Sequence, residues 1–143
     1  MKITSLIARL LLGLIFLTFG LNGFFHFIPM PPPAGVAGQF MAALFASPFW
    51  TVIFAVQTLG GVLLLANRYV PLALVALAAV IVNILTFHIF MAPAGLPLAL
   101  VVAVLWTIVA LRNKQYLASL FVAQTEPAKD SSPVLPKSNY ARG

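Results

Sequence analysis

Cysteine is absent from the 143-residue sequence and acidic residues are almost absent, which excludes several kinds of chemistry. Without cysteine the chain cannot form disulfides, perform thiol redox reactions or bind an iron–sulfur cluster through thiolates. The first carboxylate side chain is Glu126, so the long apolar region before it has none for acid–base catalysis or for a metal site. No phosphate-binding loop, dinucleotide fingerprint or nucleophile triad is visible. We therefore assign no catalytic and no metal-binding residues, and the sequence leaves open whether the chain is an enzyme.

Charged residues are also scarce, at 7% of the chain against 62% hydrophobic residues. A soluble domain of this size must cover its surface with many more polar groups. A bilayer-spanning helix needs about 17–25 apolar residues, and four stretches come close to that length. We therefore predict an all-α, polytopic membrane protein with one domain, residues 1–121, followed by a disordered cytoplasmic tail over 122–143. The four transmembrane helices of the predicted bundle are expected at about 6–28, 48–66, 70–90 and 97–111.

Basic residues flank these helices on one side only. Lys2 and Arg9 lie at the start of the first helix, Arg68 lies between the second and third, and Arg112 and Lys114 follow the fourth. The two opposite loops contain no charge. The positive-inside rule therefore places both termini in the cytoplasm of a bacterial cell, with the chain in its cytoplasmic membrane. Because the basic residues form no dense patch, the expected partner is the lipid bilayer and not nucleic acid.

The first apolar segment has a basic start, as a cleaved signal peptide has, but its length and the bulky Phe24, Phe25 and Phe27 favour a retained helix. The loop after it begins with a proline-rich stretch, residues 29–33, which we expect to be stiff and extended. Residues 39–45 then predict a short amphipathic helix in the membrane interface, lying over the outer mouth of the bundle.

Prolines and glycines mark the boundaries and contacts of the predicted helices. We expect Pro29 to close the first helix, and three other prolines occupy first-turn positions, where the missing N–H costs nothing. Gly13 and Gly20 form a stripe of small residues on the first helix, which predicts close packing against a neighbour. The first-turn prolines are Pro48, Pro71 and Pro97.

The outward ends of the first and third helices carry similar sequences, each with an Asn followed by a Phe-His pair. Asn22 and His26 belong to the first helix, and Asn83 and His88 belong to the third. The pattern is typical of a degenerate duplication of a helical hairpin. Asn22 and His26, four residues apart, are expected on one face, whereas Asn83 and His88 lie about 140° apart on a regular helix. The second pair could share a face only through a π-bulge or local unwinding.

These four residues, together with Gln57 near the middle of the second helix, are the candidate ligand-binding residues. Polar side chains at membrane depth are costly, so Asn22, Gln57 and Asn83 either join helices through hydrogen bonds or contact a ligand. The two histidines are either interfacial side chains near helix ends or ligand contacts as well. In the ligand-binding interpretation, His and Asn hydrogen-bond a quinone carbonyl and nearby phenylalanines supply apolar walls.

Five segments, in their order and spacing, resemble the DoxX family, and the resemblance covers nearly all of residues 9–112. It implies a four-helix inner-membrane protein. It also implies an association with quinone-linked oxidation, because relatives include a subunit of a thiosulfate:quinone oxidoreductase and the family is named for a terminal oxidase complex. The segments are residues 20–29, 60–64, 67–72, 83–88 and 93–97.

The resemblance therefore predicts an accessory or quinone-interacting subunit, with membrane or oxidoreductase proteins as partners and a quinone as the cofactor to consider. The alternative is a non-catalytic membrane protein that binds a lipid or small hydrophobic ligand, or assists a partner or a transport step. Family members often carry Glu just before the glycine pair of the second helix, where this chain has Gln57. A neutral amide cannot exchange protons as a carboxylate can, which argues against an inherited proton-coupled role.

Overall fold

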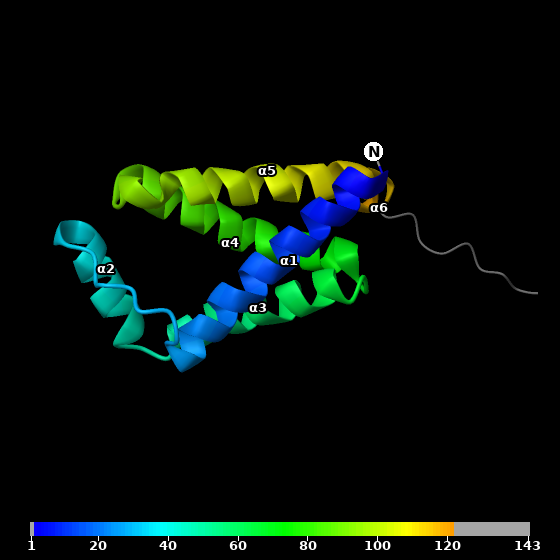
Figure 1. Ribbon diagram of the computed structural model, residues 1–143. Helices are drawn as coiled ribbons and strands as arrows, with labels where there is room; N and C mark the ends of the chain where they lie inside the picture. Colours follow the sequence, from blue (N-terminus) through cyan, green and yellow to red (C-terminus); the bar gives the residue numbers. More distant parts are fainter. Residues whose placement is uncertain (1, 122–143) are drawn as a thin grey trace, which may run out of the picture.

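The computed structural model describes residues 2–121, which form helices and connecting segments without strands. Four long helices make up the body of the protein (Figure 1). The predicted all-α helical membrane bundle is thereby confirmed, while the predicted tail, residues 122–143, lies outside the described range. The long helices are α1 (Lys2–Phe25), α3 (Phe49–Leu65), α4 (Val70–Phe90) and α5 (Leu96–Arg112). The shorter elements are α2 (Gly35–Phe45), η1 (Pro93–Gly95), α6 (Lys114–Ala118) and η2 (Ser119–Phe121).

Three segments are long and apolar enough to cross a membrane alone: Ile3–Phe25, Val70–Phe90 and Pro93–Arg112. Helix α3 has 17 residues, or roughly 25 Å at about 1.5 Å per residue, which is slightly less than a bilayer core. It qualifies as a span together with α2, which meets it at an angle of 91°. Four spans are therefore present if this bent pair is counted as one.

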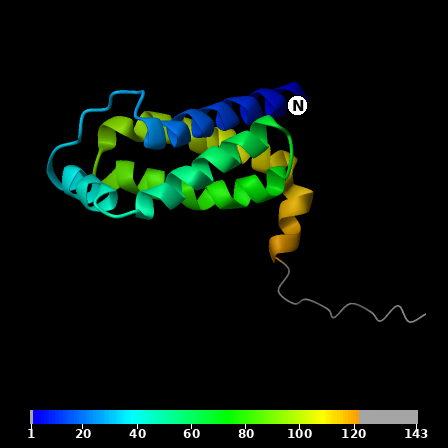
Figure 2. The same ribbon diagram turned by 90° about the horizontal axis from the view of Figure 1, so that it is seen from below.

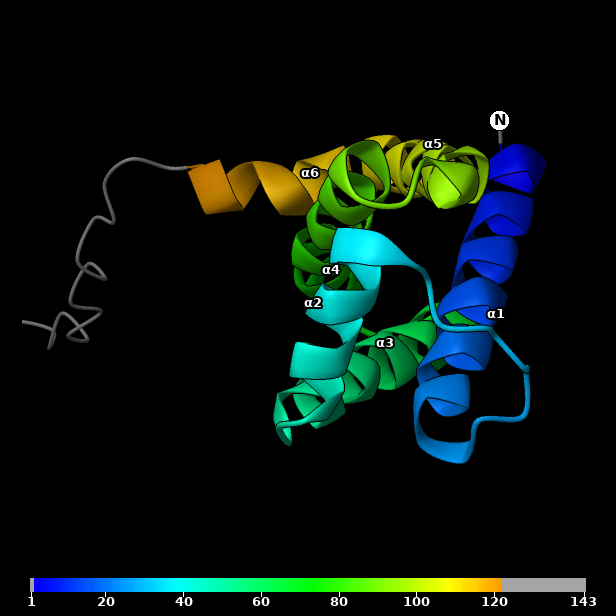
Figure 3. The same ribbon diagram turned by 90° about the vertical axis from the view of Figure 1, so that its left-hand side faces the viewer.

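The long helices form a four-sided bundle in which α1 and α4 each pack mainly against α3 and α5. The two ends of the bundle differ (Figures 1 and 2). One end holds the start of α1, the α3–α4 turn and the end of α5, and it is named the arginine end after Arg9, Arg68 and Arg112. The other holds η1, α2 and the non-helical residues 26–34, which we call the strap, and it is named the strap end. Figure 3 views the molecule from this side, with α2 and the strap in front of the bundle.

Helices α1 and α3 approach each other so closely that neither Gly20 nor Gly61 can be replaced without moving backbone. A Cβ added to Gly20 would lie 2.6 Å from the backbone nitrogen of Thr58, and one added to Gly61 would lie 2.5 Å from that of Leu17. Gly13 lies in the same interface, against Leu65 and Gly61. The prediction that Gly13 and Gly20 mark a close helix contact is confirmed.

Most of the buried core lies in the half of the bundle nearer to the arginine end. Because lipid tails are as apolar as leucine, close packing and interhelical hydrogen bonds stabilise this half, rather than removal of apolar surface from water. One such bond runs from Trp106 Nε1 on α5 to the Leu74 carbonyl on α4, at 2.9 Å. The largest fully buried side chains are those of Phe16, Leu12, Leu64, Leu74, Leu77 and Val109.

Helix α1 ends at Phe25, three residues before the end expected from hydropathy. His26 adopts a left-handed conformation with φ 52°, and its N–H donates to the Asn22 carbonyl at 2.8 Å. The N–H of Ile28 donates to Asn22 Oδ1 at 2.5 Å instead of continuing the helical ladder. Pro29 then has no N–H to offer. The Asn22 side chain therefore turns the chain out of the helix before the proline is reached.

Helix α2 begins at Gly35, four residues before the predicted segment, and it bridges the ends of two long helices. Phe40 packs against Phe87 of α4, with ring centroids 5.7 Å apart, and Phe45 stacks on Phe54 of α3 at 6.1 Å. These contacts, from the middle and the last residue of α2, hold it across the strap end of the bundle.

Candidate functional site

A cavity of about 890 Å³ lies at the strap end, between the four long helices, α2 and the strap. We call it the strap-end pocket. Its volume falls within the roughly 300–1,000 Å³ typical of small-molecule sites. Four of the five candidates from sequence line it, namely Asn22, His26, Gln57 and His88.

The walls of the pocket are mainly apolar and aromatic, and every long helix contributes to them. The strap adds Met30 and prolines, and no Asp, Glu, Lys or Arg is part of the lining. An uncharged, largely hydrophobic molecule is therefore the ligand that suits these walls. The larger apolar side chains of the lining include Ile15, Phe16, Phe19, Met41, Phe45, Phe54, Ile84, Phe87, Leu98 and Val102.

Gln57 places a primary amide on the wall of this pocket. The residue is only 7% exposed, and within residues 2–121 its amide makes no hydrogen bond. Among the described residues, Thr58 Oγ1 is the buried side-chain polar atom without a partner, so the amide nitrogen and oxygen of Gln57 are open to the pocket. The two donors and the acceptor of this amide are therefore available to a molecule in the pocket. The interhelical hydrogen bond that sequence offered as the alternative is not formed by Gln57 in this part of the chain.

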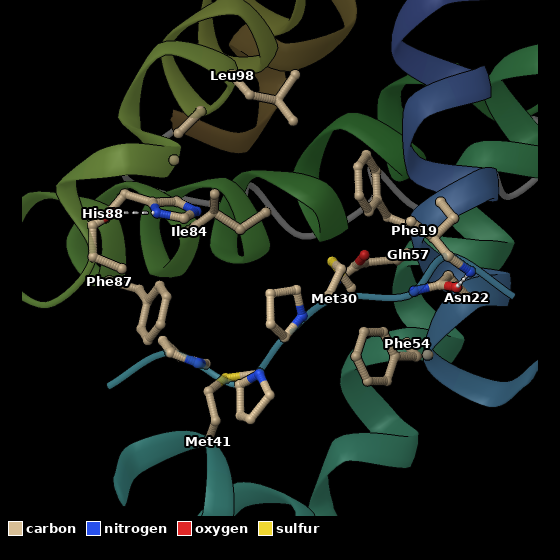
Figure 4. A pocket seen from close by; sticks show the side chains of 18 of the residues that line it. Phe19, Asn22, Met30, Met41, Phe54, Gln57, Ile84, Phe87, His88 and Leu98 are labelled. Atoms are coloured by element: carbon tan, nitrogen blue, oxygen red, sulfur yellow. Dashed lines mark hydrogen bonds between the residues drawn. The ribbon is translucent and has the colours of Figure 1, made fainter. Parts of the chain in front are cut away.

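Asn22 combines a structural contact with a free donor group. Its Oδ1 accepts the Ile28 N–H, as described above, and the residue is 3% exposed. Its amide nitrogen makes no hydrogen bond within the described residues and belongs to a side chain that lines the pocket. Figure 4 shows Asn22 and Gln57 on one side of the pocket and His88 on the other.

The His88 ring is fixed by two neighbours from the α4–α5 connection. Its Nδ1 lies 2.8 Å from the Ala92 carbonyl. A carbonyl only accepts, so Nδ1 carries the hydrogen and Nε2 of the neutral ring is left as an acceptor. The ring also lies on Gly95, where an added Cβ would be 2.0 Å from His88 Cε1. Gly95 is thus needed to leave space for this ring orientation.

The remaining two candidates are placed differently. His26 follows the last residue of α1 and is exposed, so it lies at the rim of the pocket and does not share a helical face with Asn22. Asn83 is exposed and is absent from the lining. Helix α4 is continuous from Val70 to Phe90, so Asn83 and His88 point in different directions, as their spacing requires.

Sequence reasoning missed several parts of the pocket. It did not include Gly95, although the Pro-flanked segment 93–97 stood out, nor the wall from α5, which carries only apolar side chains. Residue type gives no signal for such wall positions. Within residues 2–121 there is also no cluster of three or more His, Cys, Asp or Glu side chains that could hold a metal ion.

A sequence model of the DoxX family matches residues 4–92, which is more than half of the chain. The matched region extends from the first turns of α1 past the end of α4, and it contains all five candidate residues. It ends before η1 and α5, which complete the pocket wall. Comparisons with curated proteins and with solved structures gave no significant match.

Proposed function

The chain belongs to the DoxX family, and we propose that it is an accessory subunit of a membrane oxidoreductase system that binds a quinone in the strap-end pocket. The observation that carries the proposal is the unpartnered amide of Gln57 in a large, uncharged, aromatic-lined cavity. An amide that faces an apolar cavity without a hydrogen-bond partner can donate to a ligand that carries an acceptor. A quinone carbonyl is an acceptor of that kind, carried on an otherwise hydrophobic molecule.

The polar groups suit a planar ligand with oxygen atoms at opposite edges. On one side, Gln57 and Asn22 offer amide N–H donors to a carbonyl oxygen. On the other, His88 offers Nε2 as an acceptor when its ring is neutral, which suits the hydroxyl group of the reduced form. The aromatic walls, including Phe54 and Phe87, stack against a flat ring. The described residues supply no carboxylate, so we assign binding and not proton transfer to this site.

A second function is supported by the same walls. Their apolar character also suits an acyl chain, so the alternative is a non-catalytic protein that holds a lipid or another small hydrophobic molecule.

In both cases the protein is proposed to lie in a bacterial cytoplasmic membrane. The arginine end would face the cytoplasm, because the basic side chains of the described residues gather there. Reporter fusions after Asn67 and Asn113 should then read as cytoplasmic, and one at Gly35 as external.

Identification of the molecules that co-purify with the protein tests the proposal. The full chain would be extracted in a mild detergent, and the bound small molecules would be analysed by mass spectrometry. We expect a quinone in amounts comparable to the protein, and a reduced amount in a Gln57→Leu variant. Phospholipid alone, without quinone, would contradict the first function and support the second.

A further inference from the structure

A second, smaller cavity of about 320 Å³ lies at the arginine end. It forms where the first turns of α1, the α3–α4 turn and the end of α5 meet, at the end opposite to the strap (Figure 2). Two arginines line it, and amide and hydroxyl groups surround them. The polar residues of the lining are Ser5, Arg9, Asn67, Arg112 and Asn113.

The two guanidinium groups have no acidic side chain to balance them within residues 2–121. Arg9 is held in place from α3, since its Nη1 donates to the carbonyls of Leu64 and Leu65 at the end of that helix. Its other nitrogens remain as donors. Arg112 approaches the same cavity from the last turn of α5 and is exposed. Two like charges that line one cavity favour an anion between them, and guanidinium groups match phosphate oxygens in shape and charge.

An apolar row leads away from this cavity along α1. Leu6 lines the cavity and is 46% exposed, and Leu10 and Leu14, each four residues further along, are 40% and 54% exposed. Residues four apart lie next to each other on a helix surface. A molecule with a phosphate in the cavity and a hydrocarbon chain would therefore find a continuous apolar surface for that chain.

We propose that this cavity, the arginine-end pocket, binds the phosphate group of an anionic phospholipid whose acyl chain lies along Leu6, Leu10 and Leu14. Basic pockets between transmembrane helices are known positions for lipid headgroups. A zwitterionic lipid suits the site less, because its ammonium group would meet two cations. The assignment does not depend on the ligand of the strap-end pocket.

Lipid binding to the purified full-length protein would be measured by native mass spectrometry, with phosphatidylglycerol and phosphatidylcholine of the same acyl chains as probes. We expect the wild type to bind phosphatidylglycerol about tenfold more tightly, as charge-assisted hydrogen bonds imply. Arg112→Gln should abolish most of this preference. Arg68→Gln is the matched control, because Arg68 is exposed at the same end but does not line the pocket, and it should keep the preference. Thermal unfolding of both variants in detergent checks that they remain folded.

Three results would overturn the proposal. An equal loss in the Arg112→Gln and Arg68→Gln variants would show that only the overall surface charge attracts the lipid. If inorganic phosphate raised the thermal unfolding temperature of the protein as much as phosphatidylglycerol does, the pocket would be assigned to a free anion. A several-fold gain in lipid binding after Glu126→Gln and Asp130→Asn together would identify the carboxylates of the chain itself as the occupants.

Discussion

In the half of the bundle near the arginine end, side chains from all four long helices meet and pack together, and the arginine-end pocket of about 320 Å³ lies at its tip. Leu12, Leu64, Leu74, Leu77 and Val109 are all fully buried there. In the half near the strap end, the same four helices surround a cavity of about 890 Å³, and a short helix and a proline-rich segment cover it. The interior of the first half is filled by the protein itself, whereas the interior of the second leaves space for another molecule.

This difference indicates a division between stability and binding. In a bilayer, helix association depends on packing and hydrogen bonds between helices, so the filled half should carry most of the stability. The hollow half has aromatic contacts between α2 and the long helices, and its Gln57 amide faces the cavity without a hydrogen-bond partner. Substitutions in the two halves should therefore have different effects on unfolding and on ligand binding.

The largest effect is expected from Gly61→Leu, which acts on the contact that both halves share. The new side chain would collide with the backbone of α1 at Leu17, so the two helices must separate. We expect a loss of about 3 kcal/mol or more in unfolding free energy, together with loss of ligand binding. Thermal or denaturant unfolding in detergent measures the first effect. Leu59→Phe, at a site of α3 that is 63% exposed, is the control and should change stability by less than about 0.5 kcal/mol. A similar loss in both variants would show that the glycine contact is not what limits stability.

A smaller effect is expected from Gly95→Ala, which is confined to the strap end. The added methyl group would displace the His88 ring and break its bond with the Ala92 carbonyl. We expect a loss of about 1–2 kcal/mol in stability and weaker ligand binding. Removing the ring as well, in a Gly95→Ala, His88→Ala double variant, should restore stability but not binding. If the double variant binds ligand like the wild type, His88 has no part in the site.

The smallest effect is expected at His26, whose left-handed backbone is strained for any residue with a Cβ. His26→Gly should be more stable than His26→Ala by about 1 kcal/mol and close to the wild type, because glycine relieves the strain. Since His26 lies at the rim, ligand binding should remain within about twofold of the wild type in both variants. A tenfold loss in both would instead make the imidazole a ligand contact. Equal unfolding free energies of His26→Gly and His26→Ala would mean that the turn at residue 26 relieves its strain in another way.

The sequence predicts the helices of this protein well because hydropathy and proline positions act locally. Helix α4 spans residues 70–90, as expected, with Pro71 in its first turn. The stripe formed by Gly13 and Gly20 also predicts that α1 packs closely against a neighbouring helix, because small residues let two backbones approach. The end of α1 could not be predicted in this way, since it depends on a hydrogen bond that the N–H of Ile28, beyond the helix, donates to the Asn22 side chain.

The candidate site is less predictable than the fold, and the repeated Asn and Phe-His pattern shows why. Asn22 and Asn83 have similar neighbours in sequence, but Asn22 is buried and Asn83 is exposed. Burial depends on which face of the helix meets other helices, and this is set by the whole bundle. The position of His88 likewise depends on Gly95, which lies on the far side of a turn. Such contacts between distant residues have no local sequence pattern.

The most direct test of the division between the two halves is to replace the unpartnered amide and measure stability and binding on the same variant. Gln57→Leu keeps the side chain buried but removes its polar atoms, and Asn83→Leu is the matched change at an exposed position outside the pocket. The dissociation constant of a short-chain quinone would be determined by equilibrium titration in detergent, alongside thermal unfolding. For Gln57→Leu we predict unchanged or slightly higher stability and an affinity about tenfold weaker, equivalent to the loss of one hydrogen bond. Asn83→Leu should bind like the wild type. Lower stability with unchanged affinity in Gln57→Leu would contradict the account, because the amide would then support the fold and not the ligand.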